Sequence, residues 1–531
     1  MAQDDNDERD TGHDDGRRFV AALSRAVDEG DSREAAAVVR AGWFELSADH
    51  GEVTRLLLER LPAQALHSEP LLTMMLGICY NVIGFHRVRA LRYFQWSVRA
   101  ARAARPDLDT VDRALIRATE GVAYRLVGHP RRSVGPSRAA VQLLDSLSET
   151  DAVHMRSLTR VYSQVGVSLF YGGDVDDAMD AFSKGLAATP DSAPSPGFGN
   201  LAMLAGIHAL RGDLPEAQAH IDYARTGPWT DRQRNMYTGT FYRLAEAVIA
   251  LERLDATTAR EHLAAMQHDR RSIEHWIAIA QVEAIAGLVE GDPARALAEL
   301  EALVAMRGRE GRSTDARHAL ARIRTLLHLA LGNPEAAAAL IDRVSSDDPQ
   351  AAVDRARADL AMGNTGTALT TLRSLVGEGM TSRTAAEAAA LEAAVLLRFS
   401  PTARSRGVVH RLGSLLKATD QRLAVALLPV QDFERVVAAL SEAGFGDLVT
   451  EVPLRSLLPD LQSGVILTQR ERAVLSNLMS TGSVAEIAGA LFVSTNTVKT
   501  QLRSIYRKLG VTNREDAVAV ALDRRLLAEP D

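Results

Sequence analysis

The sequence predicts an all-α protein, in which a long helical-hairpin solenoid is followed by a compact four-helix domain. Three observations lead to this fold class. Alanine, leucine and arginine are abundant while aromatic residues make up only 5% of the 531 residues, which favours packed helices over sheets. A short glycine-containing pattern recurs along most of the chain. The C-terminal part carries a dense series of helix-capping signals.

The solenoid is predicted from the pattern Gly-[Asp/Asn]-x-x-x-Ala, which recurs between about Arg18 and Leu448. In each copy an apolar helix ends, Gly takes the left-handed cap, Asp or Asn caps the next helix, and a small Ala lets the two helices approach closely. The pattern occurs at Gly30, Gly173, Gly212, Gly291, Gly332 and Gly363, with a degenerate copy at Leu254 and two poorly matching units at Gly84 and Gly128. From Gly173 onward the copies follow one another at intervals of 31 to 42 residues, as in a tetratricopeptide-like array.

Charge and cysteine content narrow the class of protein further. The chain has a formal net charge of −7 and a single cysteine, Cys79, which excludes an intrachain disulfide framework and suits a reducing cytoplasm. Residues 1–17 are acidic and turn-rich and contain no apolar run, so we expect a disordered tail there rather than a signal peptide or membrane anchor. No later stretch is apolar enough to span a bilayer.

Catalytic, cofactor and metal motifs are missing from the sequence. Lysine occurs only at positions 184, 417, 499 and 508, so the nucleotide-binding pattern Gly-x-x-x-x-Gly-Lys-[Ser/Thr] does not exist. The fourteen histidines are scattered without His-Glu-x-x-His or a cysteine partner. We therefore expect no catalysis, no cofactor and no bound metal.

Four short helices are predicted between Leu467 and Leu527. Three of the helix starts carry a hydroxyl residue with glutamate three positions later, a spacing that lets both side chains satisfy free backbone N–H groups. These pairs are Thr468/Glu471, Ser483/Glu486 and Thr512/Glu515. Ser494 is an N-cap of the simpler kind and starts the third helix, which is predicted from Thr495 to Leu509.

The third of these helices is amphipathic and has a basic outer face. Its buried stripe is expected to consist of Val498, Leu502, Ile505 and Leu509, which turns Asn496, Lys499, Thr500, Arg503 and Arg507 outward. Between Ser494 and Gly510 there are four cations and no acid. With the short helix Val484 to Phe492 before it, this layout predicts a helix-turn-helix whose second helix enters the major groove. The alternative is a helical bundle with a solvated basic face, although such a face would ordinarily mix charge signs.

This C-terminal segment resembles the LuxR-type (LuxR/FixJ/GerE) DNA-binding domain. The resemblance rests on five short matches: Leu467-Thr468-x-Arg470-Glu471-x-x-Val474-Leu475, Ser483-x-x-Glu486-Ile487-Ala488, Leu491-Phe492-Val493-Ser494, Thr497-Val498-Lys499-Thr500 and Arg507-Lys508-Leu509-Gly510-Val511. The sequence departs from the family pattern at Gln469, at Thr481-Gly482 and at Gln501. The first two affect a helix start and a loop, whereas Gln501 lies beside the base-reading positions and bears on the preferred DNA sequence.

The resemblance also implies roles for individual residues. Lys499, Thr500 and Arg503 would face base edges, where long cations can donate to guanine O6 and N7 and a threonine methyl can touch thymine. Phosphate contacts, which position the helix without reading sequence, would come from Thr497, Arg507 and Lys508. The helix-turn-helix motif itself comprises Val484, Ala485, Glu486, Ile487, Ala488, Val493, Ser494, Thr495, Asn496, Val498, Gln501 and Leu502.

The last predicted helix, Asn513 to Leu527, has an apolar face made of Ala517, Val520 and Ala521. In the LuxR-type family this helix pairs two DNA-binding domains across a two-fold axis, which implies a homodimer on a two-half-site operator. The residues fit equally well a face that packs only on the other three helices of its own domain. The sequence leaves both interpretations open.

The chain therefore divides into a disordered acidic tail (1–17), tetratricopeptide-like repeats (18–448), a linker (449–465) and a LuxR-type domain (466–531). It resembles the MalT-like architecture without the nucleotide-binding module. We expect a cytoplasmic transcriptional regulator that binds double-stranded DNA and whose repeats bind an unknown small-molecule or protein effector. Tyr93, Phe94 and Trp96 either line a ligand groove in the repeats or belong to their core. The alternative function is a protein-interaction scaffold whose C-terminal domain does not bind DNA.

Overall fold

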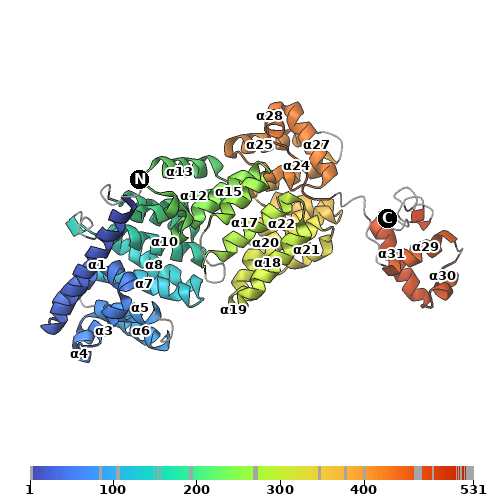
Figure 1. Cartoon of the computed structure of the whole chain (residues 1–531). Helices are drawn as coiled ribbons and strands as arrows, with labels where there is room; N and C mark the ends of the chain where they lie inside the picture. Colours follow the sequence, from blue (N-terminus) through green and yellow to red (C-terminus); the bar gives the residue numbers. More distant parts are fainter. Residues whose placement is uncertain are drawn as a thin grey trace. The chain divides into compact units, whose positions relative to one another are not determined.

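The computed structural model is helical, and no β-strand occurs in the part of the chain that it describes, which confirms the predicted all-α class (Figure 1). It describes residues 4–531 apart from 83–86, 103–107, 149, 152–154, 156, 191–194, 267–272, 345–347, 376–379, 399–401, 460–468, 481–482, 510, 512, 515–516, 519–520 and 522–531. For some further residues the structure describes the backbone but not the side chain: these are 4–15, 67, 81–82, 87–88, 102, 469, 479–480 and 507–509. Among the described helices, none combines the length and apolar character needed to cross a membrane.

The helices group into two compact units, the first of which contains residues 1–209, 216–246 and 265–268. Up to residue 252 the α-helices are α1 (Asp4–Asp28), α2 (Ser32–Ala41), α3 (Gly51–Leu58), α4 (Ala63–Ser68), α5 (Pro70–Val82), α6 (Arg87–Arg102), α7 (Thr110–Leu126), α8 (Pro130–Asp145), α10 (Leu158–Gly172), α11 (Val175–Ala187), α12 (Phe198–Arg211), α13 (Leu214–Thr226), α14 (Asp231–Asn235) and α15 (Thr240–Glu252). Consecutive helices pack as hairpins, as α7 with α8 and α10 with α11 illustrate.

The second unit contains residues 210–215, 247–264 and 269–531. Its α-helices up to residue 450 are α16 (Ala256–Ala264), α17 (Trp276–Glu290), α18 (Pro293–Met306), α19 (Gly308–Gly311), α20 (Thr314–Ala330), α21 (Pro334–Ile341), α22 (Pro349–Ala361), α23 (Thr365–Ser374), α24 (Ser382–Leu397), α25 (Ala403–Thr419), α26 (Leu423–Ala426), α27 (Val430–Leu440) and α28 (Asp447–Thr450). The C-terminal domain follows with α29 (Gln469–Ser480), α30 (Val484–Ala490) and α31 (Thr495–Leu509).

The predicted hairpin joints are confirmed in their backbone geometry. All six glycines of the repeated pattern have left-handed φ angles, between +71° and +91°, and the degenerate copy does the same at Leu254, with φ +56°. At one joint Gly291 N donates to Leu288 O and Asp292 N donates to Gly287 O, the two bonds that close a helix C-terminus in a Schellman motif. The alanine five positions after each cap is buried in every copy. Gly84 lies outside the described residues.

This geometry predicts that a glycine-to-alanine change lowers the stability at one site of the second unit and raises it at another. Gly291 has φ +87° and free space where a Cβ would lie, so Gly291→Ala should lower stability by about 1 kcal/mol through backbone strain alone. Gly407 lies inside α25 with equally open space and ordinary φ, so Gly407→Ala should raise stability by about 0.5–1 kcal/mol. Thermal unfolding of the full chain measures both, and equal signs would contradict the assignment of Gly291 as a left-handed cap.

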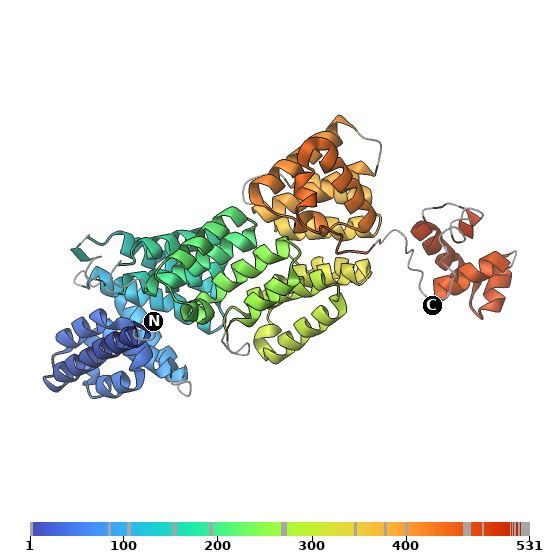
Figure 2. The same ribbon diagram turned by 45° about the horizontal axis from the view of Figure 1, so that its top comes forward.

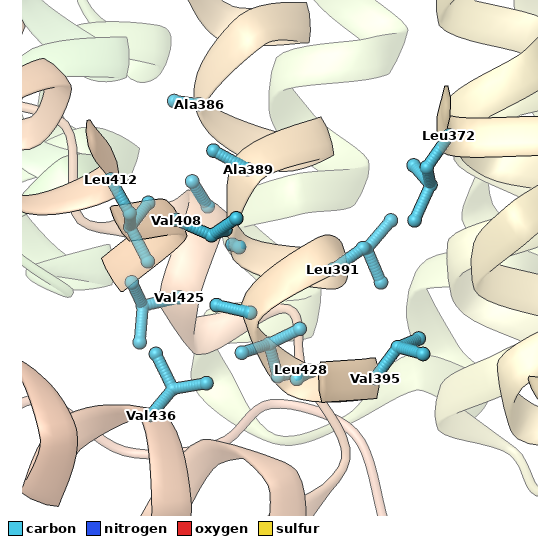
Figure 3. Close-up of a cluster of buried hydrophobic side chains, with 14 of the residues drawn as sticks. Leu372, Ala386, Ala389, Leu391, Val395, Val408, Leu412, Val425, Leu428 and Val436 are labelled. Atoms are coloured by element: carbon cyan, nitrogen blue, oxygen red, sulfur yellow. The ribbon is translucent and has the colours of Figure 1, made fainter. Parts of the chain in front are cut away.

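The core of the second unit is centred on α24, which is buried on nearly all sides. Figure 3 shows alanines and branched residues of α24 meeting side chains of α23, α25, α26 and α27. Small Ala386 and Ala389 allow close helix approach, while Leu391 and Val395 fill the space toward neighbouring helices (Figure 3). This tight packing forms the core at the C-terminal end of the repeats, which we call the α24 core.

Residues 454–458, which we call the strap, lie in the predicted linker but pack against helices of the second unit, next to the α24 core. Leu457 N donates to Ala426 O at 2.8 Å, and Ser456 Oγ donates to Leu428 O at 2.6 Å. Leu458 is 2% exposed and is buried against α20, α21 and α22. The Arg455 guanidinium donates to Val289 O near the end of α17. The predicted linker is therefore not uniform: its middle is held on the repeats, and 460–465 lie outside the described residues.

The structure also differs from the expectation for residues 1–17, because helix α1 begins at Asp4 rather than after a disordered tail. Among the three aromatic residues left open by the sequence, Tyr93 stacks on Tyr80 with 5.6 Å between ring centroids. Phe94 occupies the space that a Cβ on Gly77 would need, so both rings pack between α5 and α6.

Candidate nucleic-acid interface

The C-terminal domain is built around an apolar core shared by α29, α30 and α31. The core contains Val474, Leu475, Leu478, Ile487, Ala488, Val498, Leu502, Ile505, Ala517 and Ala521. The predicted stripe of α31 is confirmed for Val498, Leu502 and Ile505, all of which are buried, while the Leu509 side chain is outside the described set. Burial of this stripe fixes which face of α31 points outward.

The N-termini of α30 and α31 are held by the hydroxyl caps that the sequence predicts. Ser483 Oγ accepts from Glu486 N at 3.3 Å while the Glu486 carboxylate accepts from Ser483 N at 3.0 Å, a complete capping box. Ser494 Oγ accepts from Thr497 N at 3.1 Å and so caps α31. The other two predicted pairs involve Thr468 and Thr512, which are not among the described residues.

A short turn joins α30 to α31 and sets the angle between them. Leu491 N donates to Ile487 O at 3.0 Å, and Val493 N donates to Ala488 O at 3.0 Å, so the chain leaves α30 in a closed turn. Phe492, between them, takes a left-handed conformation with φ +54°. Along the chain α31 follows α30 directly, which is the order required of a helix-turn-helix; Figure 1 labels both helices, and Figure 2 shows the same red group of helices in a turned view.

The outward face of α31 carries the residues to which the resemblance assigns DNA contacts. Asn496, Thr497, Lys499, Thr500 and Arg503 are all exposed, and Gln501 is half-buried at the side. The Thr500 hydroxyl donates to Asn496 O at 2.9 Å, which satisfies its proton within the helix and leaves its methyl group available for apolar contact. The side chains of Arg507 and Lys508 are outside the described set.

The two acids of the domain that the structure describes, Glu471 and Glu486, both accept hydrogen bonds from other groups of the domain. Glu471 is buried and accepts from Ser504 Oγ at 2.7 Å, on the inner side of α31. The Glu486 carboxylate is turned onto the start of α30. Within the described part of the chain, Lys499 and Arg503 form no ion pair. Their charges are therefore available to a polyanion, which gives the face the electrostatics of a DNA-binding surface.

Sequence reasoning missed two features of this site. The predicted cap of Glu471 with Thr468 lies partly outside the described residues, and the structure adds a contact that the sequence did not indicate: Glu471 is buried beneath α31, where its bond to Ser504 ties α29 to α31. Glu471 stands between Arg470 and Arg472 at a helix start, and this setting carried no signal for such a contact. The fully exposed ring of Phe492 was also missed, because an apolar residue after a helix ordinarily returns to the core.

Comparison with known proteins identifies the domain. A family model described as "Bacterial regulatory proteins, luxR family" (GerE) matches residues 465–521. Over 62 residues, 12% of this chain, it is 45% identical to the "Probable transcriptional regulatory protein NarL" of Mycobacterium tuberculosis (strain ATCC 25618 / H37Rv), covering 29% of that protein. Over 108 residues, 20% of this chain, it is 35% identical to the "HTH-type transcriptional regulator MalT" of Klebsiella pneumoniae (strain 342), covering 12% of it.

The chain thus spans less than a third of either relative, and the matches concern its C-terminal part. Among solved structures, the "APC/C hetero-tetramer Cut9-Hcn1" covers 82% of this chain and 96% of its own at 12% sequence identity, with a TM-score of 0.27 that is too low to support an argument. In the described residues no group of three or more His, Cys, Asp or Glu side chains is placed to hold a metal ion. Residues 465–521 are a helix-turn-helix domain of the luxR family of bacterial regulatory proteins.

Proposed function

We propose that the chain is a sequence-specific DNA-binding transcriptional regulator in the cytoplasm, without catalytic activity of its own. The observation that carries this proposal is the outward face of α31, where Lys499 and Arg503 are exposed beside Thr500, while the two described acids of the domain, Glu471 and Glu486, accept hydrogen bonds from Ser504 and from the start of α30. Lys499, Thr500 and Arg503 read base edges in the major groove. Thr497, Arg507 and Lys508 contact phosphates and hold the register of α31 in the groove.

The regulator binds double-stranded DNA as a homodimer, and an effector in the helical repeats controls it. Ala517 and Ala521 are buried in the domain core, so dimer pairing through the last helix uses other residues of that helix. An effector, either a small molecule or a protein, acts by favouring one arrangement of the repeats over another. It changes DNA binding only by as much as its affinity for the two arrangements differs.

The strap provides a route by which the repeats control the DNA-binding domain. Among the described residues, Leu458 is the last one that is buried against the repeats, and Gln469 is the first residue of α29, eleven residues later. A chain of this length reaches at most roughly 40 Å, close to the spacing of about 34–36 Å between half-sites one helical turn apart. An effector that loosens α20, α21 or α22 would release the strap and lengthen this tether.

Releasing the strap by mutation tests this control. Leu458→Ala removes the buried side chain from the contacts with α20 to α22 and should cost about 2–5 kcal/mol of anchoring free energy. We expect the variant to bind a two-half-site operator with an affinity different from the parent chain and to lose any response to effector. Leu56→Ala, at an exposed leucine of α3, is the matched control. Unchanged operator affinity with the strap released would count against control through this segment.

DNA binding itself is tested by selecting sequences from random duplex DNA with the full chain. The proposal predicts enrichment of a motif with two related half-sites, because a two-fold symmetric dimer presents α31 twice. Retention of DNA without enrichment, lost steeply as salt is raised, would indicate only non-specific phosphate binding. Such a result would favour the scaffold function instead.

A further inference from the structure

Phe492 is the most exposed large apolar side chain of the described residues, with 95% of its surface open to solvent. Its backbone is left-handed, with φ +54°, a region that bulky residues rarely adopt and that glycine or asparagine occupies more readily. The ring is thus held in water on a strained backbone. No contact among the described residues of the domain explains why phenylalanine stands there, because the turn is closed by bonds of Leu491 N and Val493 N rather than by the ring.

The position of Phe492 relative to α31 indicates which molecule would contact its ring. It stands two residues before Ser494, the N-cap of α31, and therefore at the end of the recognition helix that meets the bases. Val493, Thr495 and Asn496 around it are also exposed and uncharged. From this end the exposed surface continues into the cationic face of α31, without an intervening acid.

Charge complementarity favours duplex DNA over a protein as the partner of this ring. The unpaired cations of the adjoining face bring a polyanion to the end of α31, and the ring approaches DNA together with them. The groove offers an aromatic ring two apolar surfaces, the thymine methyl group and the deoxyribose. A protein partner that covered Phe492 would have to compete with DNA for the same end of the helix.

We propose that Phe492 is a DNA-contacting residue that packs against a thymine methyl group or the adjoining deoxyribose at the edge of the site read by Lys499, Thr500 and Arg503. The inference rests on the proposed function, since it assumes that α31 enters the major groove. It adds a second apolar group, beside the Thr500 methyl group, to a recognition surface that otherwise consists of hydrogen-bonding and charged groups.

The test replaces Phe492 with glycine in the full chain and measures affinity for the operator obtained by selection. Glycine accepts the left-handed backbone, so the domain should unfold at the same or a higher temperature than the parent. Operator affinity should nevertheless fall by about tenfold. The slope of log affinity against log salt should stay unchanged, because no charge is removed. Tyr223→Ala, at an exposed aromatic of α13, is the control and should bind as the parent does.

The possible outcomes separate this inference from the proposed function. If the parent chain binds the operator and Phe492→Gly binds it within twofold, Phe492 does not contact DNA and the inference is wrong. If the parent chain prefers no duplex sequence, the proposed function fails first and the inference fails with it. Loss of affinity accompanied by a lower unfolding temperature would assign the ring a structural role and also overturn the inference. Replacing thymine by uracil in the operator then distinguishes the two contacts. Loss of the methyl group should lower the affinity if the ring packs on that group, and should leave the affinity unchanged if the ring packs on the deoxyribose.

Discussion

Replacing Glu387 with glutamine should lower the free energy of unfolding of the second unit by about 3–5 kcal/mol, the cost of breaking a buried ion pair by removing one partner. Glu387 lies on α24 and is 1% exposed. Its two oxygens accept from Arg322 at 2.6 Å and from Arg357 at 2.9 Å. Loss of its charge would leave the buried guanidinium of Arg357 and the partly buried guanidinium of Arg322 without full compensation. Chemical denaturation of the full chain measures the change.

A second carboxylate in the same network provides an internal control. Asp354 is also buried, but only its Oδ1 accepts from Arg357, at 2.6 Å, and its Oδ2 has no hydrogen-bond partner among the described atoms. Burial raises the pKa of Asp354 to about 6, whereas at Glu387 the charges of Arg322 and Arg357 outweigh burial and hold the pKa well below its usual range. Because the charged form of Asp354 is disfavoured, Asp354→Asn should cost less than half as much as Glu387→Gln.

The opposite shifts also predict how each residue affects the pH dependence of stability. The folded pKa of Asp354 lies above its unfolded value, so this residue makes the second unit more stable as pH falls from about 6 toward 4, and Asp354→Asn removes that rise. Glu387 has the reverse sign, and its contribution is complete above its unfolded pKa and is lost in more acidic solution. Equal costs for the two variants at pH 7 would contradict this account.

The second large effect is expected at the DNA-binding face. Lys499→Ala and Arg503→Ala should each weaken operator binding by about 1–3 kcal/mol, because each removes hydrogen bonds to a base edge. Both variants should also tolerate changes at one operator position that the parent rejects. Affinity measured on the operator and on single-base variants of it tests both statements. Each side chain is exposed, so the fold should be unaffected.

Lys417→Ala is the matched control for charge. Lys417 is an exposed lysine near the end of α25, and its removal changes the net charge equally without touching the C-terminal domain. It should leave operator affinity and base preference unchanged. Equal losses from Lys417→Ala and Lys499→Ala would mean that binding depends on total charge rather than on the face of α31.

The features that could be predicted from the sequence are those set by short-range rules. Gly291 and its counterparts needed only the local cap chemistry, and Val498, Leu502 and Ile505 needed only helical periodicity. The network of Glu387 could not be predicted, because its partners Arg322 and Arg357 lie on α20 and α22 and meet only when the helices pack.

Other features of the chain depend on details that no local pattern encodes. Pro453 and Pro459 made residues 449–465 look like a linker, yet Leu458 is buried against Leu329, Ala337 and Ala361, which lie about 100 residues or more earlier in the chain. The sequence carried no sign that Phe492 has a left-handed backbone and a ring exposed to solvent. The pairing role of the last helix, Asn513 to Leu527, stays a prediction, since most of it lies outside the described residues.

Sequence-specific DNA binding is the central claim, and one ratio tests it most directly. The full chain is titrated, at one physiological salt concentration, with the selected operator and with a scrambled duplex of equal length and composition. The account predicts that the dissociation constant for the operator is lower by about a thousandfold or more, as direct base readout by α31 requires. A ratio near one would show that the chain holds DNA only through phosphates, and would contradict its role as a sequence-specific regulator.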